Sequence, residues 1–199
     1  MTKTKVIGFY GVAQAGKSTA AHMAAEMLRN KGYKVAIRSF AGPLKEGLAE
    51  MGIHKDKTPD LYREAAQYMG TEICRAYDDN WWVNQMKHTV DTMGDDTIIL
   101  IDDCRFANEL DYLKSIDASL VFILAGPRFD ESNPMYEHAS EIIAVSHEKY
   151  YMFEDYSVTR MPPKPTYTPD YIVPNYADIT NMMDELQDII LKIEVNGLD

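Results

Sequence analysis

Residues 11–18 read Gly-Val-Ala-Gln-Ala-Gly-Lys-Ser and match the pattern G-x-x-x-x-G-K-[ST]. The segment follows an apolar run at residues 5–10, which we expect to form a short buried strand, and precedes a helical pattern at residues 17–30. In this context the backbone N–H groups of the loop and the N-terminus of the helix face a row of phosphates. The alternative, a glycine-rich turn that binds nothing, receives little weight because the context fits. The segment therefore predicts an α/β fold with a nucleotide phosphate site after its first strand.

The loop also predicts the ligands of this site. Lys17 is expected to reach the β- and γ-phosphate oxygens of ATP, and Ser18 is expected to ligate Mg²⁺. A further acid for Mg²⁺ should end a neighbouring strand, and Asp102 and Asp103 both follow the apolar residues 98–101. Because side chains alternate along a strand, only one of the two acids can face the metal. The loop residues predicted to bind ATP are Gly11, Ala13, Gln14, Ala15, Gly16, Lys17, Ser18 and Thr19.

Apolar runs alternate with helical patterns along the chain. Strands are expected at residues 5–10, 34–40, 97–101, 120–125 and 171–174. Runs that are apolar on both faces indicate a parallel sheet covered on both sides, which predicts a three-layer α/β/α fold with five parallel strands. Residues 1–199 are expected to form one domain. Within it we expect a helical lobe at about 53–95, with two helices parted near 78–80, a loop-like segment at 126–141 and an irregular Tyr/Pro-rich segment at about 147–170.

The net charge of −11 disfavours a protein that binds a nucleic-acid backbone over a broad surface, since such binding needs many clustered cations. A nucleotide-sized ligand needs only a few, and arginines outside the first strand–helix–strand unit could be gathered by folding. The two cysteines are interpreted as reduced packing residues. No apolar run reaches the roughly 18 to 20 residues of a spanning helix, and the chain begins directly with a strand pattern. We therefore expect a cytoplasmic protein with small-molecule partners, no membrane and no stable nucleic-acid binding, and we leave a homodimer open.

Five sequence blocks resemble a known family. The blocks are GVAQAGKST (11–19), SFAGPLKEGLAE (39–50), YREAAQYMGTEICR (62–75) with DDNWWV (78–83), DDCRFANE (102–109) and HASE (138–141). They are similar to the phage deoxynucleoside monophosphate kinases and, more distantly, to the animal-type phosphomevalonate kinases. The resemblance implies a P-loop kinase that transfers the γ-phosphoryl group of ATP to a deoxynucleoside monophosphate and yields ADP and a deoxynucleoside diphosphate. It also implies that the helical lobe binds the acceptor and that residues 126–141 form a lid. A phage-encoded enzyme would work in the host cytoplasm.

The resemblance implies roles for individual residues. Among the catalytic residues, Arg128 would bring a cation from the lid to the phosphates, and Asp103 is favoured over Asp102 as the acid that serves Mg²⁺. Asn175 follows the last strand, where the adenine of ATP is expected. The implied catalytic residues are Lys17, Asp103, Arg105 and Arg128. The implied acceptor-binding residues are Ser39, Phe40, Lys45, Arg63, Gln67, Arg75, Trp82, Arg105, His138 and Glu141.

Some of these roles have a competing interpretation. Trp82 would either stack on a base or pack in the core. His138 and Glu141 would either contact the acceptor or pack at the hinge of the lid, and Glu109 is expected to cap the turn after Arg105.

Two other functions remain open at this point. The first is a kinase for another phosphorylated metabolite, such as phosphomevalonate, or for a modified base in DNA. The second is a P-loop NTPase switch, which would bind partners in a nucleotide-dependent way and phosphorylate no acceptor. The arginines beyond the loop favour an acceptor kinase over a switch.

Overall fold

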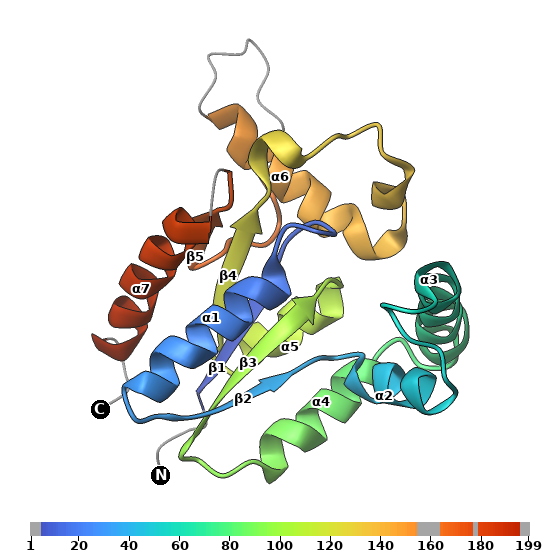
Figure 1. Ribbon diagram of the computed structural model, residues 1–199, viewed down its shortest axis with the longest axis horizontal. Helices are drawn as coiled ribbons and strands as arrows, with labels where there is room; N and C mark the ends of the chain where they lie inside the picture. Colours follow the sequence, from blue (N-terminus) through green and yellow to red (C-terminus); the bar gives the residue numbers. More distant parts are fainter. Residues whose placement is uncertain (1–4, 155–163, 177–178, 196–199) are drawn as a thin grey trace. The chain divides into compact units, whose positions relative to one another are not determined.

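The computed structural model describes residues 5–154, 164–176 and 179–195 (Figure 1). Its centre is a five-stranded sheet in the order β2-β3-β1-β4-β5. Strand β1 pairs in parallel with β3 and with β4, and β4 pairs in parallel with β5. The strand bounds are β1 Val6–Tyr10, β2 Lys34–Arg38, β3 Thr97–Cys104, β4 Ser119–Leu124 and β5 Tyr171–Pro174. The five predicted strands and the parallel sheet are therefore confirmed.

Helices cover the two faces of this sheet. On one face α1 (Lys17–Asn30) contacts β1 and β3, while α7 (Ile179–Val195) contacts β5 and packs against α1 (Figure 1). On the other face α5 (Ala107–Ser115) packs so closely that a Cβ atom at Gly8 would lie 2.6 Å from the Leu113 side chain. Tyr10, two residues along the same strand, faces His147 of α6 (Ile142–Glu154) with ring centroids 5.3 Å apart. The arrangement is the predicted three-layer α/β/α fold.

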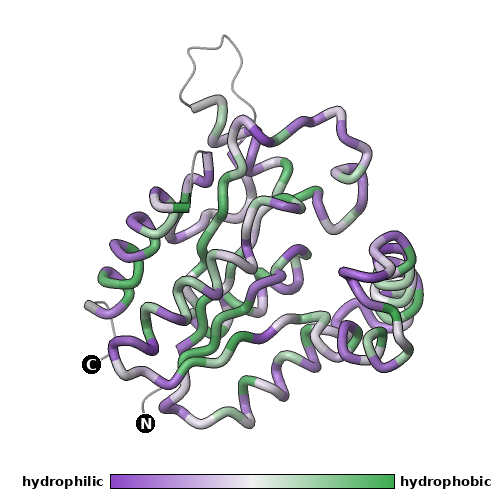
Figure 2. The backbone as a smooth tube through the Cα atoms, viewed as in Figure 1, coloured by the Kyte–Doolittle hydropathy of each residue, from purple (hydrophilic) through white to green (hydrophobic). Residues whose placement is uncertain are grey.

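The central strands supply most of the apolar core of this unit. All residues of β1 are buried, and the first five residues of β3 are buried as well. Figure 2 shows these strands as mostly hydrophobic along their length. This continuous apolar character is what a parallel strand covered on both faces requires. Polar side chains are therefore found at the ends of these strands.

The chain divides into two compact units, Arg38–Met93 and the remainder. The smaller unit contains α2 (Gly42–Glu50), α3 (Pro59–Gln67), the π-helix η1 (Tyr68–Arg75) and α4 (Trp81–Thr92). Its core includes Leu44, Leu48, Trp82, Val83 and Met86. The predicted lobe at 53–95 lies mostly within this unit, which begins earlier than expected because α2 belongs to it.

The segment between β4 and β5 differs in part from the prediction. Three short 3₁₀ helices, η2 (Gly126–Arg128), η3 (Pro134–Tyr136) and η4 (Ala139–Glu141), occupy the segment expected to be loop-like. Helix α6 then runs from Ile142 to Glu154, so the expectation of irregular structure is wrong for residues 147–154. Residues 155–163 lie outside the described part, and residues 164–170 contain no helix or strand. Among the described residues, none of the helices combines the length and the apolar character needed to cross a membrane.

Candidate active site

The loop between β1 and α1 has a backbone that only glycine can adopt easily at two positions. Gly11 has φ 152° and Gly16 has φ 103°, both in the region that side chains disfavour. A Cβ atom at Gly11 would lie 2.5 Å from the Ile123 carbonyl oxygen, and one at Gly16 would lie 2.6 Å from the Asn175 amide nitrogen. The two glycines therefore allow the loop to approach the ends of β4 and β5.

Lys17 is the first residue of α1 and is buried, with 6% of its surface exposed. Its ammonium group donates to the carbonyl oxygens of Gly11 at 2.7 Å and of Val12 at 2.8 Å. Burial and, to a smaller extent, the charge of Arg105 lower the pKa of Lys17 to about 7, and the carboxylates of Glu141 and Asp103 oppose the shift. A polyanion in the loop would restore the charged form, so this lysine is poised to take up a proton when phosphates arrive.

Glu141 connects the lid segment to the loop. Its side chain is buried, accepts the backbone N–H of Ala13 at 2.7 Å and forms an ion pair with the Arg105 guanidinium. His138 accepts the Ser140 N–H at 3.2 Å and thereby caps the short helix η4 that carries Glu141. These contacts join Glu141 to the loop and to Arg105.

Arg105 lies directly after β3, where a turn is held by Glu109. The Glu109 carboxylate is buried and accepts the backbone N–H groups of Arg105 at 2.7 Å and of Phe106 at 3.1 Å. The predicted capping role of Glu109 is therefore confirmed. The turn directs the Arg105 guanidinium to Glu141, close enough to Lys17 for its charge to affect the lysine.

Arg128 and Asn175 meet at the same loop residue. The Arg128 guanidinium donates to the carbonyl oxygens of Ala15 at 3.3 Å and of Asn175 at 2.8 Å. The Asn175 amide also donates to the Ala15 carbonyl oxygen, at 2.7 Å. The lid segment and the residue after β5 are thus brought together at the phosphate-binding loop, as their predicted roles require.

The oxygen donors at this site suit Mg²⁺ held mainly through phosphates and water. Asp103 acts electrostatically on Lys17, and the Ser18 side chain is exposed at the start of α1. Within the described ranges, no three His, Cys, Asp or Glu side chains are grouped to bind a metal ion. Such a site, with one hydroxyl and one carboxylate, fits a metal that keeps several waters.

The remaining predicted acceptor residues lie in the 38–93 unit. Phe40 is buried at 2% exposure, which makes its ring a core residue, and Arg75 is buried and donates to the Asp79 carbonyl oxygen at 3.2 Å. Arg63 is exposed on α3. The helix changes from α to π geometry between the two arginines, at Tyr68. The others in this unit are Ser39, Lys45, Gln67 and Trp82.

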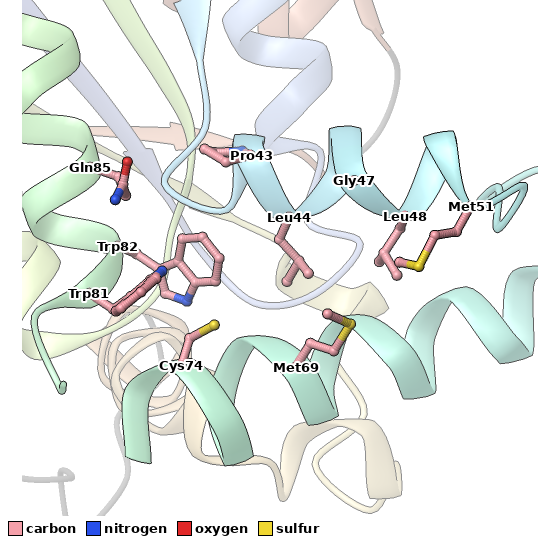
Figure 3. Close-up of a pocket in the computed structure, with 10 residues that line it drawn as sticks. All are labelled: Pro43, Leu44, Gly47, Leu48, Met51, Met69, Cys74, Trp81, Trp82 and Gln85. Carbon is pink, nitrogen blue, oxygen red and sulfur yellow. The ribbon is translucent and has the colours of Figure 1, made fainter. Parts of the chain in front are cut away.

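The same unit contains an apolar pocket of about 310 Å³ (Figure 3). Trp81 and Trp82 of α4 form one side, and residues of α2 and η1 form the others. Trp82 is 5% exposed, and its indole N–H donates to the Gly70 carbonyl oxygen at 3.0 Å. Trp82 therefore packs as a core residue that also forms part of the pocket wall. The pocket is lined by Pro43, Leu44, Gly47, Leu48, Met51, Met69, Cys74, Trp81, Trp82 and Gln85.

Sequence reasoning missed Glu148. This residue of α6 is completely buried, and its Oε1 atom accepts the Gly126 N–H at 2.5 Å. Burial raises the pKa of Glu148 to about 7, although the backbone groups of Ala125 and Gly126 and the charge of Arg128 oppose the shift. No signal pointed to it, because the helix that carries it was not predicted.

Comparisons with known proteins indicate which kind of enzyme has a site like this one. Residues 53–147 match the family model described as deoxynucleotide monophosphate kinase. A protein of Acanthamoeba polyphaga mimivirus that carries the name of this family is 29% identical over 157 residues, which cover 65% of this chain and 79% of that protein. Among solved structures, the Mycobacterium tuberculosis APS kinase CysC in complex with AMPPNP and APS is similar in fold, with a TM-score of 0.52 and 15% identity over 98% of this chain and 99% of that one. The resemblance to the deoxynucleoside monophosphate kinases is therefore confirmed, and these matches support a kinase that acts on a nucleotide or another small molecule.

Proposed function

We propose that this protein transfers the γ-phosphoryl group of ATP to a deoxynucleoside monophosphate. The observation that carries the proposal is the convergence of three cationic side chains from separate segments, Lys17, Arg105 and Arg128, around one phosphate-binding loop. A transferred phosphoryl group needs positioning and charge neutralisation more than covalent chemistry. The match of residues 53–147 to the deoxynucleotide monophosphate kinase model supports the choice of acceptor.

In this proposal each cation has its own task. Lys17 releases the carbonyl oxygens of Gly11 and Val12 and binds the β- and γ-phosphates. Arg128 already reaches the loop at Ala15 and stabilises the charge on the migrating group. Arg105, which follows the neighbouring parallel strand β3, contacts the phosphate of the acceptor or the migrating group. Mg²⁺, held by Ser18 and by Asp103 through water, would neutralise phosphate charge.

The 38–93 unit supplies the remaining acceptor residues of the proposal. Lys45, Arg63 and Arg75 are the proposed ligands of the acceptor phosphate, with Ser39, Phe40 and Gln67 beside them. The pocket of about 310 Å³ beside Trp81 and Trp82 is the proposed base site, because its aromatic and apolar walls suit a planar heterocycle. His138 and Glu141 would then act on the acceptor only indirectly, through Arg105 and the loop.

The decisive experiment is a panel assay. The protein is incubated with ATP-Mg²⁺ and each ribo- and deoxyribonucleoside monophosphate, and the diphosphate products are identified. We expect a deoxynucleoside diphosphate with equimolar ADP. No product from any nucleotide, together with turnover of phosphomevalonate, would exclude the proposed acceptor while leaving a kinase. ATP hydrolysis without any phosphorylated acceptor would instead favour an NTPase switch.

A binding experiment tests the base site separately. The chain has two tryptophans, and both line the lobe pocket, so tryptophan fluorescence reports on that pocket. We expect a saturable change in fluorescence when a turned-over deoxynucleoside monophosphate is added without ATP. Trp81→Phe should remove most of this change, whereas Trp82→Phe serves as the matched control for a buried ring. A signal that no turned-over monophosphate alters would place the base outside the pocket.

A further inference from the structure

Burying the carboxyl group of Glu148 costs free energy, and packing alone does not explain why this position holds a glutamate. Its side chain has no exposed surface, and only its Oε1 atom makes a hydrogen bond, to the Gly126 N–H. The Oε2 atom is buried and makes no hydrogen bond within the part of the chain that the structure describes. An unsatisfied buried oxygen destabilises the fold, and a charged group does so more strongly. A glutamine would also accept the Gly126 N–H and would avoid burying a charge.

The Gly126 N–H that Glu148 binds belongs to the first residue of the turn that carries Arg128. The 3₁₀ helix η2 comprises Gly126–Arg128, and the Phe129 N–H closes the turn on the Gly126 carbonyl oxygen at 2.9 Å. Gly126 has φ 59°, and a Cβ atom there would lie 2.2 Å from the Tyr176 ring. The turn is therefore fixed by a backbone conformation that favours glycine, by the Tyr176 ring and by the Glu148 carboxylate.

The charge of Glu148 also acts on the arginine at the other end of the turn. Arg128 stabilises the ionised form of Glu148, which means that the carboxylate and the guanidinium attract each other. Arg128 meanwhile donates to the carbonyl oxygens of Ala15 and Asn175 and points toward the phosphate-binding loop. Glu148 thus restrains both the backbone and the charge of the residue proposed to stabilise the transferred group.

A second carboxylate contact with the backbone lies close to the one that Glu148 makes from helix α6. Glu141, the last residue of η4 before the helix, binds the Ala13 N–H of the loop, and Glu148 lies within α6. The segment from η4 into α6 therefore holds the loop through one carboxylate and the start of the lid segment through the other. From these contacts we infer that Glu148 is a positioning residue, which fixes the Gly126–Arg128 turn so that Arg128 meets the phosphates of bound ATP. The inference rests on the proposed phosphoryl transfer.

The test is a double-mutant cycle between Glu148 and Arg128, with two readouts. Turnover is measured with an acceptor found in the panel assay, and ATP-Mg²⁺ affinity is measured by calorimetry without acceptor, so that the second readout stands even if the acceptor proposal fails. Arg128→Ala should lower both kcat and ATP affinity. Glu148→Ala should lower kcat by about tenfold or more, with a small change in acceptor KM, because a misplaced arginine loses part of the 10³ to 10⁵ that such a residue can contribute. In the Arg128→Ala background, Glu148→Ala should change kcat and ATP affinity less than about twofold.

Two further variants keep the test decisive. Glu148→Gln retains an acceptor for the Gly126 N–H but loses the charge that attracts Arg128, so it should lower kcat less than Glu148→Ala does, and it tests the inference if Glu148→Ala does not fold. Glu137→Gln removes one charge from an exposed position of the lid segment and should leave both readouts unchanged. Fully additive effects of Glu148→Ala and Arg128→Ala would overturn the inference. A Glu148→Ala enzyme with parental kcat, or a folded Glu148→Gln enzyme more than tenfold impaired, would do the same.

Discussion

The Glu141 carboxylate accepts the backbone N–H of Ala13 at 2.7 Å, although the two residues are 128 positions apart in the chain. This contact joins the end of the lid segment to the loop that binds phosphates. The same carboxylate pairs with Arg105, so one buried side chain connects the loop, the turn after β3 and the lid segment. The three segments therefore share one buried carboxylate as a contact.

Replacing Glu141 should destabilise the protein before any ligand is added. In Glu141→Ala, the Ala13 N–H loses its acceptor and the half-exposed Arg105 loses its partner, which together should cost about 2 kcal/mol. Glu141→Gln should cost less, because the amide oxygen still accepts from Ala13. Urea denaturation without nucleotide measures both values. Glu137→Ala, on the exposed surface of the same segment, is the control, and equal stability of Glu141→Ala and this control would contradict the prediction.

ATP binding should be accompanied by proton uptake at alkaline pH. In the free protein the pKa of Lys17 is lowered to about 7, so much of the side chain is neutral above that pH. A bound triphosphate favours the ammonium form and raises the pKa, which requires a proton from the buffer. Calorimetry in buffers of different ionisation enthalpy should give an uptake that approaches one proton between pH 8 and 9. Lys17→Met should abolish phosphoryl transfer and lose the uptake while remaining folded; uptake that persists in a variant still able to bind ATP would assign the proton to another group.

The lowered pKa of Lys17 also makes the stability of the free protein depend on pH. A lysine whose folded pKa lies below its unfolded value of 10.5 destabilises the fold while it is protonated in the unfolded chain. The contribution of Lys17 to the free energy of unfolding should therefore become more favourable as pH rises from about 7 to 10.5. The parent should therefore become more stable relative to Lys17→Met between pH 7 and pH 10, as measured by urea denaturation. No shift would show that Lys17 is not desolvated in the free protein.

Local patterns predicted the elements that carry a strong local signal. The loop follows from its glycine and lysine spacing, and the strands follow from continuous apolar runs such as Thr97 to Ile101. Helix α6 carries no such signal, because it begins with the consecutive apolar residues Ile142, Ile143, Ala144 and Val145 and shows no polar stripe. The tyrosine and proline residues that follow it in sequence gave the whole stretch an irregular appearance.

The site itself could be predicted only as a set of residues. Sequence reasoning identified Arg128 and Asn175, but their meeting at Ala15 depends on contacts across 113 and 160 positions, which no local pattern encodes. Strand alternation restricted the metal acid to one of two residues, and the electrostatic effect of Asp103 on Lys17 supports the one that was favoured. Glu148 had no local signature, because a buried carboxylate is recognised only when its surroundings are known.

Gly126→Ala should destabilise the protein through two separable effects. The residue has φ 59°, which costs an alanine about 1 kcal/mol, and the new methyl group would lie 2.2 Å from the Tyr176 ring, which adds about 1–3 kcal/mol of overpacking. Tyr176→Ala alone should cost little, since the ring is 46% exposed. The double variant should recover the overpacking cost and retain the backbone cost. Urea denaturation of the three variants gives this cycle, and a double variant no more stable than Gly126→Ala would show that the ring is not the obstacle.

The contribution of Glu148 to the free energy of unfolding should decrease as pH rises toward neutrality. Burial raises the folded pKa of this carboxyl from 4.5 to about 7, so the folded protein holds its proton more tightly than the unfolded chain does. The resulting stabilisation is fully present below about pH 4.5 and is lost as pH rises to about 7, with a total on the order of 3 kcal/mol. Arg128 and Tyr136 both interact electrostatically with Glu148.

The isosteric variant isolates this effect. Glu148→Gln keeps the hydrogen bond to Gly126 but has no proton to lose, so its free energy of unfolding relative to the parent should increase by on the order of 3 kcal/mol between pH 4.5 and pH 8. The two proteins should be compared by urea denaturation at four or more pH values in this range. A constant difference would mean that the carboxylate is hydrated or paired in solution, and the raised pKa on which the argument depends would then be wrong.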